Sequence, residues 1–337
     1  MIDKNFFFVF TSERIFKIQN KFYCENKDIK TILEGISKKN YLEVISRTTK
    51  QKKTYNININ KIYSFKNLFV IFFNILKKKD RVFLFISIHP FTFFFFLISL
   101  FIKKKNFLFL RSDGFKEYEY ILGKKFIWIY HLMFYIMTKS VKIISCHESL
   151  SKGKVQHLVK PSELEPVWFK DYQEPNLSYP NLLYLGRIKK EKGIFSLIKI
   201  LSEQKNNVRL TIVGDGNLLK VKTSEKIILK KFINNSSDLI NEYDNCNVFI
   251  LPSFTEAQPK VVYEALARKR PIIIFDEISH ISKNLTGIFI CKREYKNLIE
   301  VINYILKNYP QIQRDIEKNI LPSKQSFLED FINFLNK

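Results

Sequence analysis

A strand–loop–helix–strand pattern between residues 247 and 275 constrains the fold of this chain more than any other feature. The apolar runs 247–251 and 271–275 each have the length and composition of a buried strand. Between them, Pro259 suits the first turn of a helix, where a missing amide donor costs nothing, and 261–266 carries apolar residues at helical spacing. Such a unit belongs to a parallel sheet. Its loop lies at the carboxyl end of a strand, where ligands bind in open α/β sheets.

The same alternation continues along the chain and predicts an α/β protein with parallel sheets. In the second half, strands are expected at 182–185, 209–213, 227–229, 248–251, 272–275 and 288–290, with helices near 193–203, 238–244, 259–269 and 295–307. In the first half, strands are expected at 6–10, 41–46, 82–88, 106–110 and 141–145, with a polar, loop-rich excursion at 11–30 and a helix at 65–79. A chain of 337 residues can bury two cores, so two domains are expected.

The formal net charge of +24 is distributed unevenly. Counting Lys and Arg against Asp and Glu, residues 1–170 carry +18 and residues 171–337 carry +6. A codon bias toward lysine explains part of the total. The asymmetry indicates an anionic partner for the first half: a membrane surface, a phosphorylated lipid or nucleic acid.

The cysteines and the start of the chain bear on its compartment. Neither a zinc site nor a disulfide framework is expected, because C-x2-C spacing is absent among the four cysteines Cys24, Cys146, Cys246 and Cys291. No signal peptide is expected, because Asp3 and Lys4 interrupt the start. A reducing cytoplasm fits these features.

Residues 82–102 are apolar at most of their 21 positions and lie between Arg81 and a run of three lysines. This length allows a transmembrane helix. However, His89-Pro90 divides the segment into a strand-length piece and a helix-length piece, and the strand-like run 106–110 follows at once. We therefore favour a buried β–α–β unit over a membrane span.

A strongly aromatic helix is expected at 126–138, between Lys124-Lys125 and Lys139. Its large rings belong to Trp128, Tyr130 and Tyr135, among others. Such a helix either packs against the sheet or lies at the headgroup level of a membrane. The pattern by itself favours neither alternative.

The loop at 184–193 has the composition of an anion-binding site. Gly186 allows the chain to turn after a predicted strand, and Gly193 allows close approach at the start of the next helix. Arg187 and Lys192 supply cations where helix amides already favour an anion. A solvated basic loop is the alternative. The phosphate-loop fingerprint G-x4-G-K-[ST] and the dinucleotide fingerprint G-x-G-x2-G are both absent from the sequence.

Two carboxylates, Glu256 and Glu264, stand in the loop and helix of the 247–275 unit with seven residues between them. Taken alone, they fit a helix-terminal and a solvated role. In context, the run 251–271 resembles the E-x7-E element of retaining glycosyltransferases of family 4. The run G-R-x4-K-G at 186–193 resembles the element that holds the donor diphosphate in that family. The resemblance covers most of residues 181–275 and is much weaker before residue 175.

The resemblance implies the GT-B fold, in which two doubly wound parallel-sheet (Rossmann-like) domains face a cleft. It places an N-terminal acceptor-binding domain at 1–165, a linker at 166–180 and a nucleotide-sugar-binding domain at 181–320. A C-terminal helix at 321–337 is expected to pack back toward the N-terminal domain.

The resemblance also implies roles for residues of the second domain. Arg187 and Lys192 would stabilise the charge that builds on a leaving diphosphate. Glu256, the third expected catalytic residue, would bind the donor sugar, and Glu264 would accept hydrogen bonds from ribose hydroxyls. The other positions expected to line the donor are Gly186, Gly214, Phe232, Ile233, Ala257, Gln258 and Lys260. Because the sequence has no D-x-D triplet, we expect no metal and no other cofactor, with the two cations in place of a divalent ion.

The first domain departs from the family pattern. Residues 11–14 lack the glycine-rich loop that relatives carry after the first strand, and Arg111-Ser-Asp113 stands where relatives often place a histidine. The candidates for the acceptor side are His89, Arg111 and Asp113. For His89, a structural role beside Pro90 is the alternative.

The hypothesis is transfer of a sugar from a nucleoside-diphosphate donor to a saccharide or lipid-linked acceptor, with retention of anomeric configuration, in cell-surface polysaccharide or lipopolysaccharide synthesis. The expected partners are the donor, the acceptor and an anionic membrane surface, but not nucleic acid. The expected location is the cytoplasm, peripheral at the inner face of the cell membrane. The alternatives are a non-catalytic basic protein that keeps the fold and binds a membrane or nucleic acid, and a nucleotide-sugar epimerase.

Overall fold

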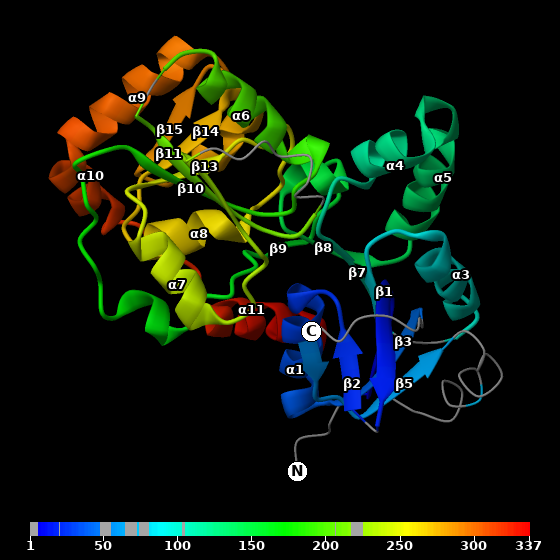
Figure 1. The fold of residues 1–337 in the computed structure, drawn as a ribbon. Coiled ribbons are helices and arrows are strands. Elements are labelled where there is room, and N and C mark those ends of the chain that lie inside the picture. Colours follow the sequence, from blue (N-terminus) through cyan, green and yellow to red (C-terminus); the bar gives the residue numbers. More distant parts are fainter. Residues whose placement is uncertain are drawn as a thin grey trace. The chain divides into compact units, whose positions relative to one another are not determined.

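The computed structural model describes residues 6–19, 21–47, 55–64, 73, 81–102, 105–205, 207–216 and 225–337. The chain divides into two compact units: Met1–Pro161 together with Gln325–Lys337, and Ser162–Lys324. Each unit contains a sheet with helices packed against it (Figure 1). The helix expected at 65–79 lies outside the described residues, apart from Phe73.

The described part of the second unit is built on a sheet of six strands that all run parallel. The strands are β10 (Asn181–Leu185), β11 (Arg209–Val213), β12 (Ile227–Lys230), β13 (Val248–Leu251), β14 (Ile272–Phe275) and β15 (Ile288–Cys291). Their order across the sheet is β12-β11-β10-β13-β14-β15. The order reverses between β10 and β13, so the loops after these two strands flank the topological switch point of a doubly wound sheet.

The helices of the second unit connect successive strands and close its carboxyl-terminal part. They are α6 (Ile194–Ser202), α7 (Ser236–Asp244), α8 (Lys260–Ala267), α9 (Tyr295–Lys307) and α10 (Tyr309–Ile316). The strands β13 and β14 are buried at every residue. Strands covered on both faces carry continuous apolar runs, and for this reason the pattern in the sequence located them correctly.

Among its described residues, the first unit contains a sheet of nine strands. They are β1 (Phe6–Ile18), β2 (Lys21–Cys24), β3 (Tyr41–Arg47), β4 (Tyr55–Ile57), β5 (Lys61–Ser64), β6 (Arg81–Ile86), β7 (Lys105–Leu110), β8 (Lys142–Ser145) and β9 (His157–Leu158). The strands β3, β6, β7, β8 and β9 continue a parallel arrangement from β1, and β5 pairs in parallel with β3. Only β2 and β4 add antiparallel pairs among the described strands.

The polar excursion expected at 11–30 was wrong. The strand β1 continues to Ile18, pairs antiparallel with β2, and is followed by α1 (Lys27–Lys39). The register places Ile15 opposite Cys24, and both side chains are fully buried. Charged residues interrupt the apolar alternation in this stretch, so its sequence pattern does not predict a strand. Pairing with β2 and burial of the apolar side chains give it strand structure.

Residues 81–110 form the β–α–β unit that was favoured over a membrane span: β6, α3 (Pro90–Ser99) and β7. The helix α3 begins at a capping box, in which His89 Nδ1 accepts from Phe91 N at 3.1 Å and Thr92 Oγ1 accepts from His89 N at 3.0 Å. Among the described helices, none has both the length and the apolar composition needed to cross a bilayer.

The remaining helices of the first unit are α4 (Gly114–Leu122), α5 (Ile127–Thr138) and α11 (Lys324–Asn336). The helix α11 packs on the sheet through aromatic rings: Phe331 contacts Phe109 and Phe334 contacts Phe107, with centroids 5.0 and 5.8 Å apart. Asp330 Oδ1 also lies 2.9 Å from His157 Nε2.

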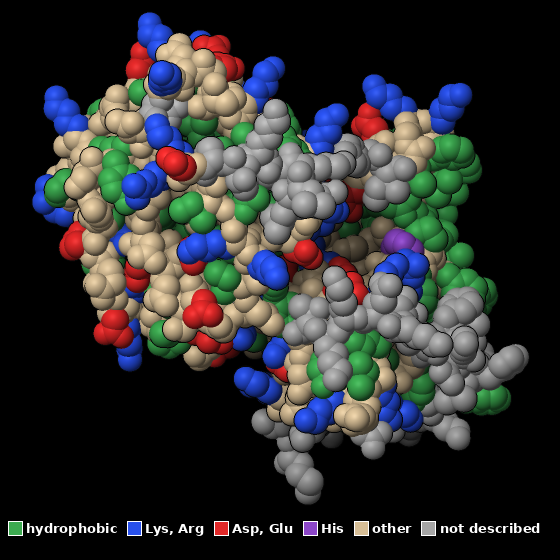
Figure 2. Space-filling view, in the orientation of Figure 1, with side chains coloured by type: hydrophobic (Ala, Val, Ile, Leu, Met, Phe, Trp, Pro, Cys, Tyr) green, Lys and Arg blue, Asp and Glu red, His purple; other side chains and the backbone are tan. Residues whose placement is uncertain are grey.

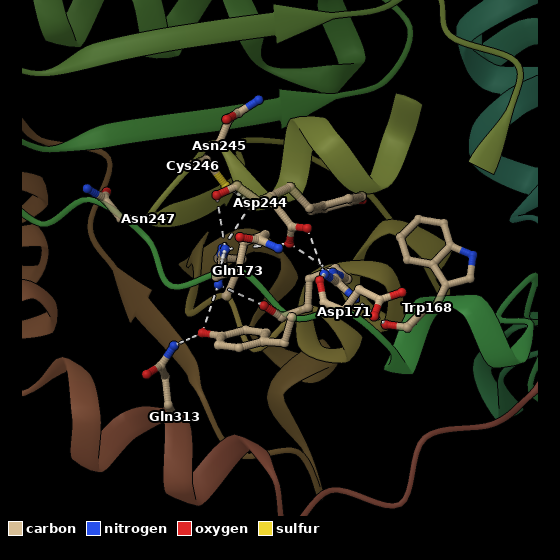
Figure 3. A network of polar contacts seen from close by, with 12 residues as sticks. Trp168, Asp171, Gln173, Asp244, Asn245, Cys246, Asn247 and Gln313 are labelled. Carbon is tan, nitrogen blue, oxygen red and sulfur yellow. Dashed lines mark hydrogen bonds and ion pairs between the residues drawn. The ribbon is translucent and has the colours of Figure 1, made fainter. Parts of the chain in front are cut away.

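A buried ion cluster ties three segments of the second unit together (Figure 3). The Arg268 guanidinium donates to both carboxylate oxygens of Asp244, at 2.9 and 2.6 Å, and to the Trp168 carbonyl oxygen at 3.0 Å. Arg270 donates to the Gln173 carbonyl oxygen at 2.7 Å, and its Nη2 lies 3.5 Å from Asp244 Oδ1. One carboxylate therefore compensates two arginines that are almost completely buried.

Replacing the shared carboxylate should strongly destabilise the second unit. In Asp244→Ala, two buried guanidinium groups lose their counter-ion, and we expect the free energy of unfolding to fall by about 3–5 kcal/mol. Urea denaturation followed by far-UV circular dichroism measures the change. The control is Glu317→Ala, which removes the partly exposed ion pair with Lys269 and should cost no more than about 1 kcal/mol. Equal losses in the two variants would contradict the role given to Asp244.

Candidate functional site

The loops that follow β10, β11 and β13 approach one another at backbone distance. Gly186 N donates to the Val213 carbonyl oxygen at 3.1 Å. A Cβ atom added to Gly214 would lie 1.8 Å from the Gly186 carbonyl oxygen, so a larger residue does not fit there. Gly193 has φ of +67°, and a Cβ atom on it would lie 1.8 Å from the Pro252 carbonyl oxygen. Glycine at positions 193 and 214 thus allows the loops to come into contact at the switch point.

Lys192 and Glu256 are brought together by this approach. Lys192 Nζ lies 2.6 Å from Glu256 Oε1, and the two side chains are 19% and 13% exposed. Ser253 Oγ donates to the same carboxylate oxygen at 2.8 Å, and His280 Nε2 lies 3.0 Å from the Glu256 carbonyl oxygen. No described residue donates to Glu256 Oε2. The carboxylate is therefore fixed at one oxygen and has acceptor capacity at the other.

Glu264 lies on α8, where its carboxylate is half-buried. Tyr243 Oη, from the last turn of α7, donates to Glu264 Oε2 at 2.9 Å. Burial, followed by the charge of Glu264, raises the pKa of Tyr243 well above its usual value. The phenol therefore stays protonated and acts as the donor of this hydrogen bond.

The remaining predicted residues at the start of α8 have partners of their own. Pro259 is the N-cap of α8, so the helix begins at Lys260, one residue later than expected. Lys260 Nζ lies 2.9 Å from Oε1 of the buried Glu163. Gln258 Nε2 donates to the Tyr263 hydroxyl, and Ala257 is half-buried. The side chain of Lys260 is thus turned toward Glu163.

Arg187 and the segment after β12 present exposed groups. The Arg187 carbonyl oxygen accepts from the buried Tyr184 hydroxyl at 2.8 Å, which fixes the backbone of the loop. Its guanidinium is exposed and forms no ion pair with any described residue. Phe232 is 50% exposed, and Ile233 beside it is half-buried. An exposed ring near the carboxyl edge of the sheet is available for stacking.

The three acceptor-side candidates lie in the first unit, where β6 and β7 end. His89 caps α3, and burial together with the charge of Arg47 lowers its pKa. Asp113 caps α4, accepting from Phe115 N at 3.1 Å and Lys116 N at 3.2 Å. Arg111 Nη2 lies 2.9 Å from Glu13 Oε1. His89 and Asp113 thus each have a structural role.

Several residues of the site have no sequence signal that would have identified them. They are Tyr243, His280 and Glu163 in the second unit, and Glu13 in the first. Each acquires its role through a partner that only the fold places nearby. Among the described residues, no group of three or more His, Cys, Asp or Glu side chains is arranged to hold a metal ion.

The family model described as glycosyl transferases group 1 matches residues 169–320 of the chain. The matched residues lie within the second unit. A relative from Staphylococcus aureus, the capsular polysaccharide biosynthesis glycosyltransferase CapM, is 26% identical over 82% of this chain and 83% of its own length.

Two further comparisons extend the picture. A Campylobacter jejuni relative, an N,N'-diacetylbacillosaminyl-diphospho-undecaprenol α-1,3-N-acetylgalactosaminyltransferase, is 24% identical over 73% of this chain and 60% of its own length. The structure of Anabaena HepE in complex with UDP and glucose is similar with a TM-score of 0.68 and 9% identity, covering 98% of this chain and 99% of HepE.

These comparisons confirm the resemblance drawn from the sequence at the level of group 1 glycosyltransferases. They also confirm the GT-B fold class, since two α/β units with largely parallel sheets are observed. The roles of individual residues remain predictions, and they rest on the geometry described above.

Proposed function

We propose that this glycosyltransferase moves a sugar from a nucleoside-diphosphate sugar to a saccharide or lipid-linked acceptor, with retention of configuration at the anomeric carbon, in the synthesis of a bacterial surface polysaccharide or lipopolysaccharide. The observation that carries the proposal is the 2.6 Å contact between Lys192 and Glu256 at the switch point. The names of the relatives support it, since one includes capsular polysaccharide and another a diphospho-undecaprenol acceptor.

The cations act on the leaving group. When the bond between the anomeric carbon and the diphosphate oxygen breaks, its electron pair stays on the diphosphate. Lys192 and the exposed Arg187 stabilise this charge, Lys192 as a point charge and Arg187 with two donors at once. The acceptor oxygen forms the new bond on the same face of the sugar, and its proton passes to the departing diphosphate.

Glu256 binds the donor sugar. With Oε1 held by Lys192 and Ser253, its Oε2 accepts from a sugar hydroxyl. The same charge stabilises the positive charge that develops at the anomeric carbon. Glu264 accepts from the ribose hydroxyls of the nucleotide. The acceptor binds the first unit near His89, Arg111 and Asp113, at the carboxyl ends of two adjacent parallel strands.

Replacing Lys192 should slow transfer far more than it weakens folding. We first identify the donor from UDP-, GDP-, ADP-, CDP- and TDP-sugars by thermal shift, since a bound ligand stabilises the folded chain. In Lys192→Met, kcat for transfer from that donor to a saccharide acceptor should fall by roughly 10²–10³, because one preset donor to the leaving group is lost.

The matched control is Lys190→Met, which removes an exposed lysine from the same loop and should keep the wild-type rate. Equal rates for the two variants would contradict the role of Lys192. Release of a free epimer without an acceptor would identify an epimerase. A chain that binds no nucleotide sugar would be the non-catalytic protein.

We also propose that transfer needs no divalent ion, because Arg187 and Lys192 supply the positive charge at the diphosphate. The expected outcome is that dialysis against EDTA leaves the transfer rate unchanged. Loss of activity in EDTA that Mg²⁺ or Mn²⁺ restores would overturn metal independence, and sugar transfer itself would stand.

The first unit is proposed to dock on an anionic membrane from the cytoplasmic side. The inner face of α5 packs in the core through Tyr130, Met133, Phe134 and Met137. Its outer face exposes Trp128, Leu132 and Tyr135, which follow helical spacing. The neighbouring α3 exposes Phe94 and Leu97, and Leu100 and Phe101 follow it.

Figure 2 shows hydrophobic side chains gathered over the region that Figure 1 labels α5 and toward α3. Lys124, Lys125 and Lys139 flank α5 and are exposed. An apolar face with tryptophan and tyrosine, bordered by lysines, fits the interface of a membrane that contains anionic lipid. The inner face of α5 thus packs in the core, and we propose the membrane alternative for its outer face.

Removing large side chains from the outer face of α5 and from the segment after α3 should release the chain from vesicles. The variant Phe101→Ser/Trp128→Ser, which replaces side chains that are 91% and 59% exposed, should lose most of its co-sedimentation with phosphatidylglycerol-containing vesicles. Binding of the unchanged protein should weaken as salt increases. The control is Tyr304→Ser, at a 57% exposed aromatic of the second unit, which should bind normally. Equal binding by all three proteins would exclude this surface as the docking site.

A further inference from the structure

Tyr243 stands outside the loops of the candidate site, yet it contacts one of the expected donor-binding carboxylates. It belongs to α7, which precedes β13, and its side chain is fully buried. Its hydroxyl donates to Glu264 Oε2 at 2.9 Å and lies 3.3 Å from the Val261 carbonyl oxygen. Glu264 Oε2 is the closer acceptor, and it carries negative charge, so it receives the stronger hydrogen bond.

We propose that Tyr243 is a positioning residue, which sets the orientation of the Glu264 carboxylate so that it can accept from two vicinal ribose hydroxyls of the donor. The inference rests on the proposed function, because it needs Glu264 to bind ribose. A carboxylate that accepts a hydrogen bond from a fixed donor keeps its plane. An unbound carboxylate on an exposed helix turn loses rotational freedom only when the ligand arrives.

The tyrosine is itself held firmly. Its ring packs against Trp168 and Phe249, with centroids 5.7 and 5.6 Å away. Its carbonyl oxygen accepts from Arg270 Nε at 2.8 Å, and the next residue, Asp244, forms the centre of the buried ion cluster. The backbone of Tyr243 is thus bonded directly to the buried ion cluster (Figure 3).

The position of Glu264 relative to that assembly strengthens the argument. Glu264 lies in α8, and Arg268, four residues later, is the C-cap of the same helix. Arg268 binds Asp244, and Tyr243 binds Glu264, so adjacent residues of α7 contact adjacent turns of α8. The phenol remains protonated because burial raises its pKa.

The test measures ribose recognition rather than activity. Isothermal titration gives the affinity for the nucleoside diphosphate that binds best among UDP, GDP, ADP and CDP, and for its 2′,3′-dideoxy analogue. The unchanged protein should prefer the ribose form. Tyr243→Phe keeps the ring and removes the hydroxyl, and it should lose about tenfold in affinity for the ribose form with none for the dideoxy form.

The matched control is Tyr309→Phe. It removes another buried hydroxyl of the same unit, one that donates to the Asn247 carbonyl oxygen at 2.6 Å, and it should keep the full ribose preference. In a Glu264→Ala background, adding Tyr243→Phe should cost no further ribose affinity, because the two residues act as one.

The outcomes separate the two hypotheses. If the unchanged protein does not distinguish ribose from dideoxyribose, or binds none of the four nucleotides, the donor role of Glu264 fails and the inference fails with it. If Glu264→Ala abolishes the preference and Tyr243→Phe retains it, the donor role stands and the positioning role is overturned. The positioning role would also be overturned if Tyr243→Phe does not fold, or if it loses the same affinity for the ribose and the dideoxy nucleotide. In either case the hydroxyl would stabilise the folded unit rather than orient Glu264.

Discussion

Strand β10 pairs with β11 on one side and β13 on the other, and the loops after these strands remain in contact only because residues 193 and 214 are glycines. Any side chain at residue 193 would meet the Pro252 carbonyl oxygen. This close approach brings Lys192 next to Glu256, although 64 residues separate them in the chain. The ion pair between Lys192 and Glu256 therefore lies at the switch point of a parallel sheet, and the sugar transfer proposed for the chain depends on it.

Ion pairs hold the helix α8 at both ends. One pair is made with the segment that begins the second unit, and the other with α7. At the start of α8, Lys260 contacts Glu163, and at its end, Arg268 contacts Asp244 and the carbonyl groups of residues 168, 170 and 171. Glu264 lies between these anchors. The burial of charge in this unit therefore serves more than stability: it fixes the helix that carries a predicted ligand-binding carboxylate.

The first unit has an aromatic core and an exposed apolar helix face. Its sheet is lined with phenylalanine, and rings such as Phe10 and Phe85 stack with centroids 4.8 Å apart. The helix α5 contributes one face to this core and leaves the other apolar and exposed. This exposed apolar face is the observation on which the proposed membrane docking rests.

Much of the fold could be predicted from the sequence, because apolar periodicity is a local property. Every strand predicted in the second unit agrees with the observed strand to within one residue, since buried parallel strands are continuous apolar runs. In the first unit the extension of β1 and the hairpin with β2 were missed. Their residues are mixed in polarity, and only pairing with neighbours gives them strand structure.

The sequence by itself determined the α/β class, the two glycine-dependent loops and the set of charged residues at the carboxyl ends of the strands. The tertiary structure decided which of those charges meet. Lys192 contacts Glu256, whereas Lys260, from the same predicted set, contacts Glu163, 97 positions away. It also supplied Tyr243, which no motif marks. The physical reason is that spacing along the chain fixes only near neighbours, while a charge or a hydroxyl in a packed interior takes its role from groups that folding brings within hydrogen-bonding distance.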